Sequence, residues 1–154
     1  MAGFIAITTP EWIKNIRSMQ VDTAVFWNKK TSFKAITQGE PFYFLRRGSF
    51  TSNSERFISG RGIFKGFQKL EPYEAWTRYG KLLGFLSKKE FEEKISNFYK
   101  GKTGQLGCIV LDKVEFFAKE LSLEECSIVF SPYIVSGKKL TDVECIQIES
   151  KSKE

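Results

Sequence analysis

The sequence contains no histidine among its 154 residues. Histidine is the usual general base of Ser–His and Cys–His nucleophile pairs and a common ligand of catalytic metal ions, so its absence excludes such sites. Zinc held by cysteine alone needs four thiolates, and the chain has three cysteines. The acidic residues fall in runs such as Glu90, Glu92 and Glu93, which are typical of a solvated helix face. We therefore expect no enzymatic activity, no metal and no cofactor.

Phosphate-binding loops are also missing from the sequence. The run Gly60-Arg61-Gly62 lacks the third glycine and the following helix of a dinucleotide-binding fingerprint, and there is no Walker sequence. This excludes nucleotide hydrolysis by this chain and leaves open hydrolysis by a domain joined to it.

No apolar run approaches the roughly 18 residues that a membrane span requires. Residues 1–9 have neither the basic region nor the apolar length of a secretory signal. The cysteines Cys108, Cys126 and Cys145 are odd in number and show no CxxC spacing. We therefore expect a cytoplasmic protein with reduced thiols and no membrane partner, in which Cys108, within an apolar run, is buried.

Basic and aromatic residues are plentiful. Lysine and arginine number 24 against 18 acidic residues, which gives a net charge of +6 and a pI near 9.2. Fifteen Phe, five Tyr and three Trp are more rings than one core needs. A basic domain is attracted to polyanions, although charge alone fits a solvated surface equally well.

Hydrophobic periodicity predicts short strands mixed with helices, without a βαβ rhythm. The expected strands are 4–8, 24–27, 42–45, 57–64 (continued by 66–70 after a kink), 106–117 and 143–148. The expected helices are 10–19, one that begins at Pro72 and stops at Gly84, and one capped by Ser87. Two glycines, Gly60 and Gly62, predict a bulge or a close approach of another backbone or a ligand. We expect an α+β domain over residues 1–148, built on a curved sheet or small β-barrel with flanking helices, and a charged, frayed tail or linker at 149–154.

One segment, 26–34, alternates aromatic residues with cations and small polar residues. Aromatic rings can stack on a base, while lysines and amides can reach phosphate or a base edge. The candidate binding residues here are Trp27, Asn28, Lys29, Lys30, Ser32 and Phe33. The alternative is that Trp27 and Phe33 pack in the core while the lysines face water. For Phe33 the core is favoured.

Arginines form a second candidate cluster. Arg46 and Arg47 end one strand of a predicted hairpin, and Arg56 and Arg61 lie on its partner, so pairing would bring them to one side of the sheet. Of these, Arg47 and Arg61 are the better candidates for contacting a polyanion.

Several motifs follow one another along the chain: Phe26-Trp27 with a polar loop ending at Phe33, then 39–45, 58–64, 75–80 and 106–111. Their order resembles the EVE-like branch of the PUA superfamily, over residues 4–140. The sequence looks especially like the N-terminal domain of some HNH restriction endonucleases and McrB-type restriction GTPases.

The resemblance implies a PUA-like fold that holds a flipped, modified base in a pocket. Carried over by position, 27–33 would be the pocket loop and Gly60 to Gly62 part of its wall. Ser59 and Asn28 would be hydrogen-bond partners, while Trp76 is favoured as a core residue. No set of three cage aromatics like that of YTH domains is evident.

The resulting hypothesis is a DNA-recognition domain of a modification-dependent restriction system, joined to a GTPase or nuclease domain, with DNA favoured over RNA. The alternatives are an RNA-binding PUA-like protein acting on tRNA or rRNA, and a protein-interaction module.

Overall fold

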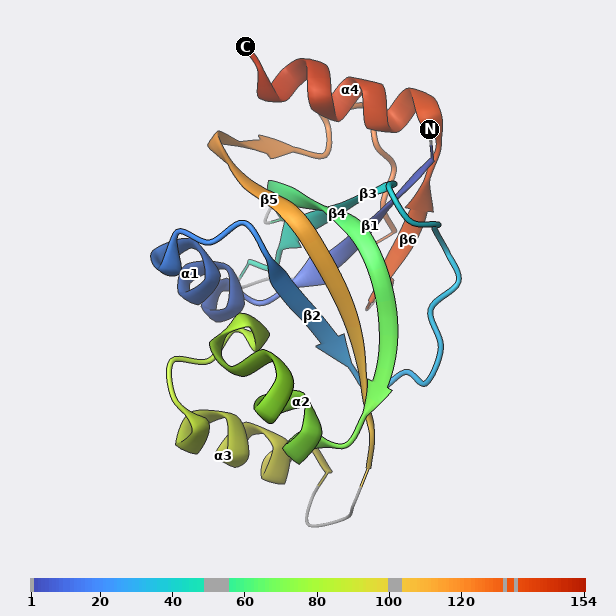
Figure 1. Cartoon of the computed structure of the whole chain (residues 1–154). Coiled ribbons are helices and arrows are strands. Elements are labelled where there is room, and N and C mark those ends of the chain that lie inside the picture. Colours follow the sequence, from blue (N-terminus) through green and yellow to red (C-terminus); the bar gives the residue numbers. More distant parts are fainter. Residues whose placement is uncertain (1, 49–55, 100–103, 132, 135) are drawn as a thin grey trace.

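The computed structural model describes residues 2–48, 56–99, 104–131, 133–134 and 136–154, and within them it shows one curved six-stranded sheet with helices packed around it (Figure 1). The strand order is β2-β5-β4-β3-β1-β6. The strands are β1 (Gly3–Thr8), β2 (Ala24–Asn28), β3 (Pro41–Arg46), β4 (Phe57–Leu70), β5 (Leu106–Ser122) and β6 (Gly137–Leu140). All neighbouring pairs are antiparallel except β1 and β3, which run parallel. This confirms the expected α+β fold on a curved sheet.

Glycines allow the long strands β4 and β5 to lie close together. Their register shifts at three places, between Ile58 and Gly60, between Arg61 and Ile63, and between Phe64 and Gly66. A Cβ at Gly60 would overlap the backbone carbonyl of Glu115 on β5. The expectation of a bulge with close backbone approach is therefore confirmed, and the approaching group is the neighbouring strand.

The first helix, α1 (Pro10–Met19), has the predicted bounds. The side chain of Thr9 accepts a hydrogen bond from the Trp12 amide, and Pro10 occupies the first turn. The predicted helix from Pro72 divides into α2 (Pro72–Tyr79) and the short 3-10 helix η2 (Gly80–Leu83), and it ends at Gly84, where φ is 94°. Helix α3 (Lys88–Tyr99) follows.

The predicted strand 143–148 is wrong, because these residues lie in helix α4 (Asp142–Ser152). Thr141 and Glu144 form a capping box that starts the helix, and helical spacing places Cys145 and Ile148 against the core. The helix continues through residues 149–152, which we expected to be frayed. The last strand is β6, which pairs with β1 and was not predicted.

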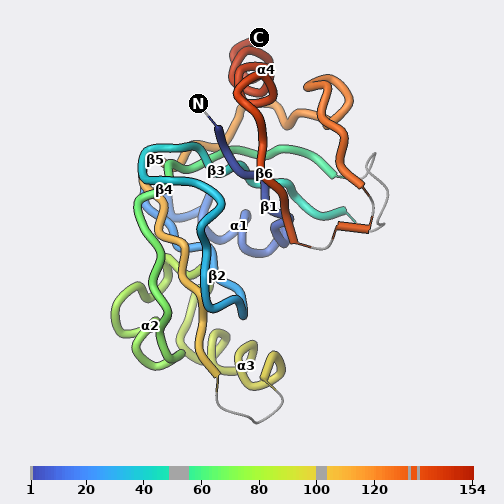
Figure 2. Tube along the Cα trace, turned by 90° about the vertical axis from the view of Figure 1, so that its right-hand side faces the viewer, coloured from blue at the N-terminus to red at the C-terminus, as the bar shows by residue number. Residues whose placement is uncertain are grey.

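Packed side chains cover both faces of the sheet. Helix α4 lies at one end of the molecule and α2 and α3 at the other (Figures 1 and 2). Successive side chains of β3 pack in two different hydrophobic clusters. Tyr43 and Leu45 pack in the cluster that includes residues of α4, and Phe42 and Phe44 pack in the cluster that includes residues of α1. A third cluster joins β2 and β5 to α2 and α3, and Cys108 is buried within it, as expected.

Candidate functional site

A cleft of about 670 Å³ lies between β1 with α1 on one side and β2 with α3 on the other. Strand β2 is one edge strand of the sheet and β1 is the neighbour of the other edge strand, β6. The curvature of the sheet therefore brings β1 and β2 to the two sides of one cleft. Aromatic rings form much of the lining: Phe4, Trp12, Phe26, Trp27, Phe33, Phe85 and Phe98. Polar lining residues include Thr8, Glu11, Asn15, Asn28, Lys30, Arg47, Glu90, Glu93, Lys94, Asn97 and Ser136.

Two tryptophans of the cleft are held by hydrogen bonds to backbone carbonyls. The Trp12 indole Nε1 donates to the Val25 carbonyl over 3.2 Å, and the Trp27 Nε1 donates to the Leu83 carbonyl over 3.1 Å. The Trp27 ring also contacts the Phe98 ring edge-on, with centroids 5.3 Å apart. Because these groups fix the rings in place, the aromatic walls are formed before any ligand enters.

Five of the ten predicted site residues line this cleft: Trp27, Asn28, Lys30, Phe33 and Arg47. Phe33 is half-buried and its ring lies edge-on to Phe4, with centroids 5.1 Å apart, so it both packs in the core and lines the cleft. Asn28 uses its Oδ1 to accept a hydrogen bond from the Lys30 amide over 2.9 Å, which shapes the turn after β2.

Lys29 and Ser32 are exposed and lie outside the lining. The Lys29 ammonium sits 4.3 Å from the centroid of the Phe98 ring, a cation–π distance that places this lysine beside the cleft.

Ser59, Gly60 and Arg61 do not line this cleft, so the structure does not bring the predicted pocket wall at 60–62 to it. Ser59 is buried and donates a hydrogen bond to Glu120 over 2.6 Å. Gly60 packs against the backbone of β5.

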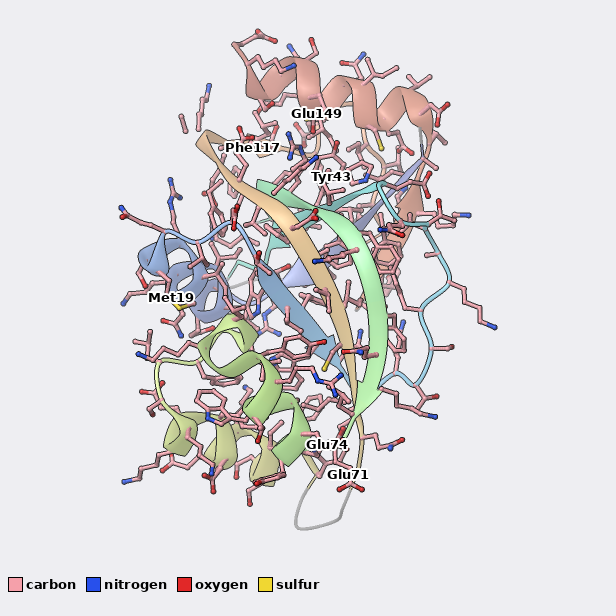
Figure 3. All side chains as sticks on the ribbon, in the orientation of Figure 1. Met19, Tyr43, Glu71, Glu74, Phe117 and Glu149 are labelled. Atoms are coloured by element: carbon pink, nitrogen blue, oxygen red, sulfur yellow. The ribbon has the colours of Figure 1, made fainter. Side chains whose placement is uncertain are left out.

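Arg61 forms an ion pair with Glu149 of α4, at 2.9 Å between Nε and Oε2. The buried hydroxyl of Tyr43 donates to the same carboxylate oxygen over 2.7 Å. Figure 3 labels Tyr43 on the sheet below Glu149 on α4. Burial, followed by the hydrogen bond to Glu149, raises the pKa of Tyr43 strongly, so the phenol stays protonated and ties α4 to the sheet.

The expected cluster of four arginines does not form one basic surface. Arg46 makes two hydrogen bonds to Glu120, at 2.7 and 2.9 Å, and Arg61 is paired with Glu149. Arg56 is 3% exposed, and its Nε and Nη1 have no hydrogen-bond partner in the part of the chain that the structure describes. Of the four, only Arg47 lines the cleft.

Sequence reasoning did not identify two aromatic residues of the lining, Trp12 on the side opposite β2 and Phe98 on the same side as Trp27. Trp12 of α1 packs in the core and Phe98 of α3 contacts the Trp27 ring, and both also line the cleft. No local pattern marks this second role. Trp76 stacks on Phe91 with centroids 5.3 Å apart and lies outside the lining, as expected for a core residue.

The cleft shows no metal-binding arrangement. Among the described residues there is no group of three or more His, Cys, Asp or Glu side chains placed to hold a metal ion. In the same part of the chain, no helix has the length and apolar character needed to cross a membrane.

No protein-family model and no characterised protein sequence matches this chain. Among solved structures, the ASCH protein of Zymomonas mobilis is similar, with a TM-score of 0.67 and 15% identity over 96% of this chain and 94% of that one. A serine-to-alanine mutant of the same protein gives 0.69 and 15% identity, covering 97% of this chain and 95% of that one. Human THYN1, in complex with DNA that contains 5-methylcytosine, gives 0.57 and 13% identity over 100% and 99% of the two chains. At this identity the likeness concerns the fold, which is of the expected PUA/EVE-like kind.

Proposed function

We propose that this chain binds nucleic acid and holds one nucleobase in the cleft between β1 and β2. The observation that carries the proposal is a cleft lined by aromatic rings, among them the partly exposed Trp27 and the 6% exposed Trp12, both hydrogen-bonded in place, which also presents Lys30 and Arg47. Flat aromatic walls suit a base, and cations at the same opening suit the phosphate attached to it.

DNA that carries a modified cytosine is the first ligand to test. Human THYN1, which shares this fold over the whole chain, forms a complex with 5-methylcytosine DNA. A cleft in a compact domain can receive a base of a duplex only if the base is extruded from the stack. We therefore propose base flipping as the mode of access.

The wider role that we propose is recognition of modified DNA in a restriction system, with a GTPase or nuclease domain joined to this one and the whole protein in the cytoplasm. The motif order that resembles restriction-associated EVE-like domains supports this assignment. RNA binding through the same cleft is the competing function, because an unpaired RNA base fits between aromatic rings equally well.

We further propose that the chain has no catalytic activity of its own. Besides the absence of histidine, burial raises the pKa of each of the thiols Cys108, Cys126 and Cys145 to about 11. These thiols are protonated at neutral pH and are poor nucleophiles. Cleavage of DNA, RNA or a nucleoside triphosphate by the purified chain, abolished by a point mutation within it, would contradict this proposal.

The test is a titration of fluorescein-labelled duplexes that differ only in one central cytosine or 5-methylcytosine, with a single-stranded RNA of the same sequence alongside. Binding should weaken by about tenfold to a hundredfold between ~50 and ~200 mM salt, as a few phosphate contacts imply, and should favour the methylated duplex. Tryptophan fluorescence should be quenched on binding. The absolute loss of fluorescence should be the same in Trp76→Phe, because Trp76 lies outside the cleft. No binding to any of the three at low salt refutes the function, and preference for the RNA favours the competing one.

A further inference from the structure

Three consecutive residues, Leu83, Gly84 and Phe85, contact both tryptophan walls of the cleft. The Leu83 carbonyl accepts the hydrogen bond from Trp27, and the Phe85 ring lies 5.9 Å from the Trp27 ring between centroids. Gly84 lies against Trp12 on the other wall. One short turn therefore touches the wall that belongs to β2 and the wall that belongs to α1.

Helix α1 is tied to the same turn by a side chain. The Asn15 amide Nδ2 donates to the Gly84 carbonyl over 2.8 Å. Asn15 lies one turn after Trp12 on the helix, and both residues line the cleft. This hydrogen bond fixes how far α1, and Trp12 with it, stands from the turn.

Two structural features favour glycine at position 84, and their effects can be tested separately. Its φ of 94° is in the left-handed region, which strains any residue with a Cβ. In addition, a Cβ at this position would overlap the Trp12 ring at Cδ1 and Nε1. Gly80, at the start of η2, also has a positive φ, of 53°, but a Cβ there would meet nothing within 4 Å.

We propose that the turn at Leu83–Gly84–Phe85, with Asn15, positions the two tryptophans and thereby sets the width of the cleft. The turn is then the part of the fold that determines which base fits. This inference rests on the proposed function for its biological meaning, while the positioning itself is a property of the free protein. Gly84 and Asn15 are positioning residues, because they act on a ligand through Trp12.

The glycine pair gives a matched test. Gly84→Ala introduces a Cβ in the left-handed helical region and Gly80→Ala introduces one at φ 53° and ψ −130°, which L side chains tolerate less well, so both should lower the melting temperature and Gly80→Ala at least as much. Only Gly84→Ala should displace Trp12, and at a temperature where both variants are folded it should weaken binding of the 5-methylcytosine duplex by about tenfold or more, as expected when base stacking is lost. Gly80→Ala should bind within about twofold of wild type, because it leaves the cleft unchanged.

Asn15→Ala provides a second variant that introduces no backbone strain. It should reduce the ratio of the affinities for the 5-methylcytosine and cytosine duplexes, because α1 loses its hydrogen bond to the turn while the aromatic rings remain. If Gly84→Ala and Gly80→Ala bind alike, or if Asn15→Ala keeps both the affinity and the preference of wild type, the inference is refuted.

A readout without any ligand separates this inference from the proposed function. In a Trp76→Phe background only Trp12 and Trp27 contribute to tryptophan fluorescence. Acrylamide quenching and near-ultraviolet circular dichroism should then change in Gly84→Ala and Asn15→Ala, and stay as in the parent in Gly80→Ala. If the wild type binds no nucleic acid but these spectra change as expected, the proposed function fails and the positioning stands; unchanged spectra refute the positioning.

Discussion

Replacing Trp27 by phenylalanine and by alanine separates its contribution to the fold from its contribution to binding. The Trp27 indole donates to the carbonyl of Leu83, a residue with no exposed surface. Trp27→Phe keeps an aromatic ring and loses this hydrogen bond, which leaves a carbonyl at a fully buried residue without its partner. The expected cost is about 1–2 kcal/mol of the free energy of unfolding.

Trp27→Ala removes the ring as well, together with its contacts to Phe85 and Phe98. Truncation of a fully buried aromatic costs about 3–5 kcal/mol. Since Trp27 is only partly buried, we expect about 2–3 kcal/mol in total, by scaling the same value. Loss of one stacking surface should weaken nucleic-acid binding by about tenfold to a hundredfold, whereas the phenylalanine variant should stay within a few-fold of wild type.

The measurements are urea unfolding followed by circular dichroism, and titration of the 5-methylcytosine duplex at a temperature where every variant is folded. Lys29→Ala is the control for charge: it should weaken binding of methylated and unmethylated duplexes equally and reduce the salt dependence. If folded Trp27→Ala binds as tightly as wild type, the cleft is not the site of the base. If Trp27→Phe is as unstable as Trp27→Ala, the stability estimate from ring packing is wrong.

Three further predictions concern the stability of the fold. Tyr43→Phe should lower the free energy of unfolding by about 1.5–3 kcal/mol in urea melts, because a buried hydroxyl loses its hydrogen bond to a carboxylate; an unchanged midpoint would show that this bond does not hold α4. The pKa of Glu120 is lowered, first by its hydrogen bond to Arg46, so its contribution to stability is present above pH 4.5 and is lost as the pH falls towards the folded-state value. The free energy of unfolding of wild type should therefore fall more steeply below pH 4.5 than that of Glu120→Gln. Equal slopes of the two proteins in this pH range would contradict this. Gly60→Ala should cost about 2–4 kcal/mol because its Cβ meets the backbone of β5, whereas Gly66→Ala, with open space at its Cβ, should cost under about 1 kcal/mol; equal melting temperatures would refute the contact.

Local signals predicted the elements that are specified locally. Thr9 and Pro10 mark the start of α1 without reference to any distant residue, and its bounds were predicted correctly. Residues 143–148 have apolar side chains at 143, 145, 146 and 148, a pattern that both a strand and a helix with two apolar stripes accommodate. The capping box of Thr141 and Glu144 is the local signal that distinguishes the two, and it favours the helix.

The candidate site could be predicted only on one side. The segment that follows β2 carries its own pattern of rings, amides and cations, and Trp27, Asn28, Lys30 and Phe33 do line the cleft. The opposing wall comes from β1 and α1, and its position depends on how strongly the sheet curves. That curvature arises from register shifts between β4 and β5, whose number and place cannot be read from residue spacing.

The arginines show why counting charges overestimates a binding surface. Their neutralising partners are far away in sequence: Glu120 lies 74 residues from Arg46, and Glu149 lies 88 residues from Arg61. A net charge of +6 therefore coexists with a cleft whose lining has three cations, Lys30, Arg47 and Lys94, and three acids, Glu11, Glu90 and Glu93. Since each phosphate contact contributes a slope of roughly 0.7–0.9 to the dependence of log affinity on log salt, the measured slope should correspond to the few cations at the cleft and to Lys29 beside it. A slope near the full net charge would instead place the nucleic acid on another face of the molecule.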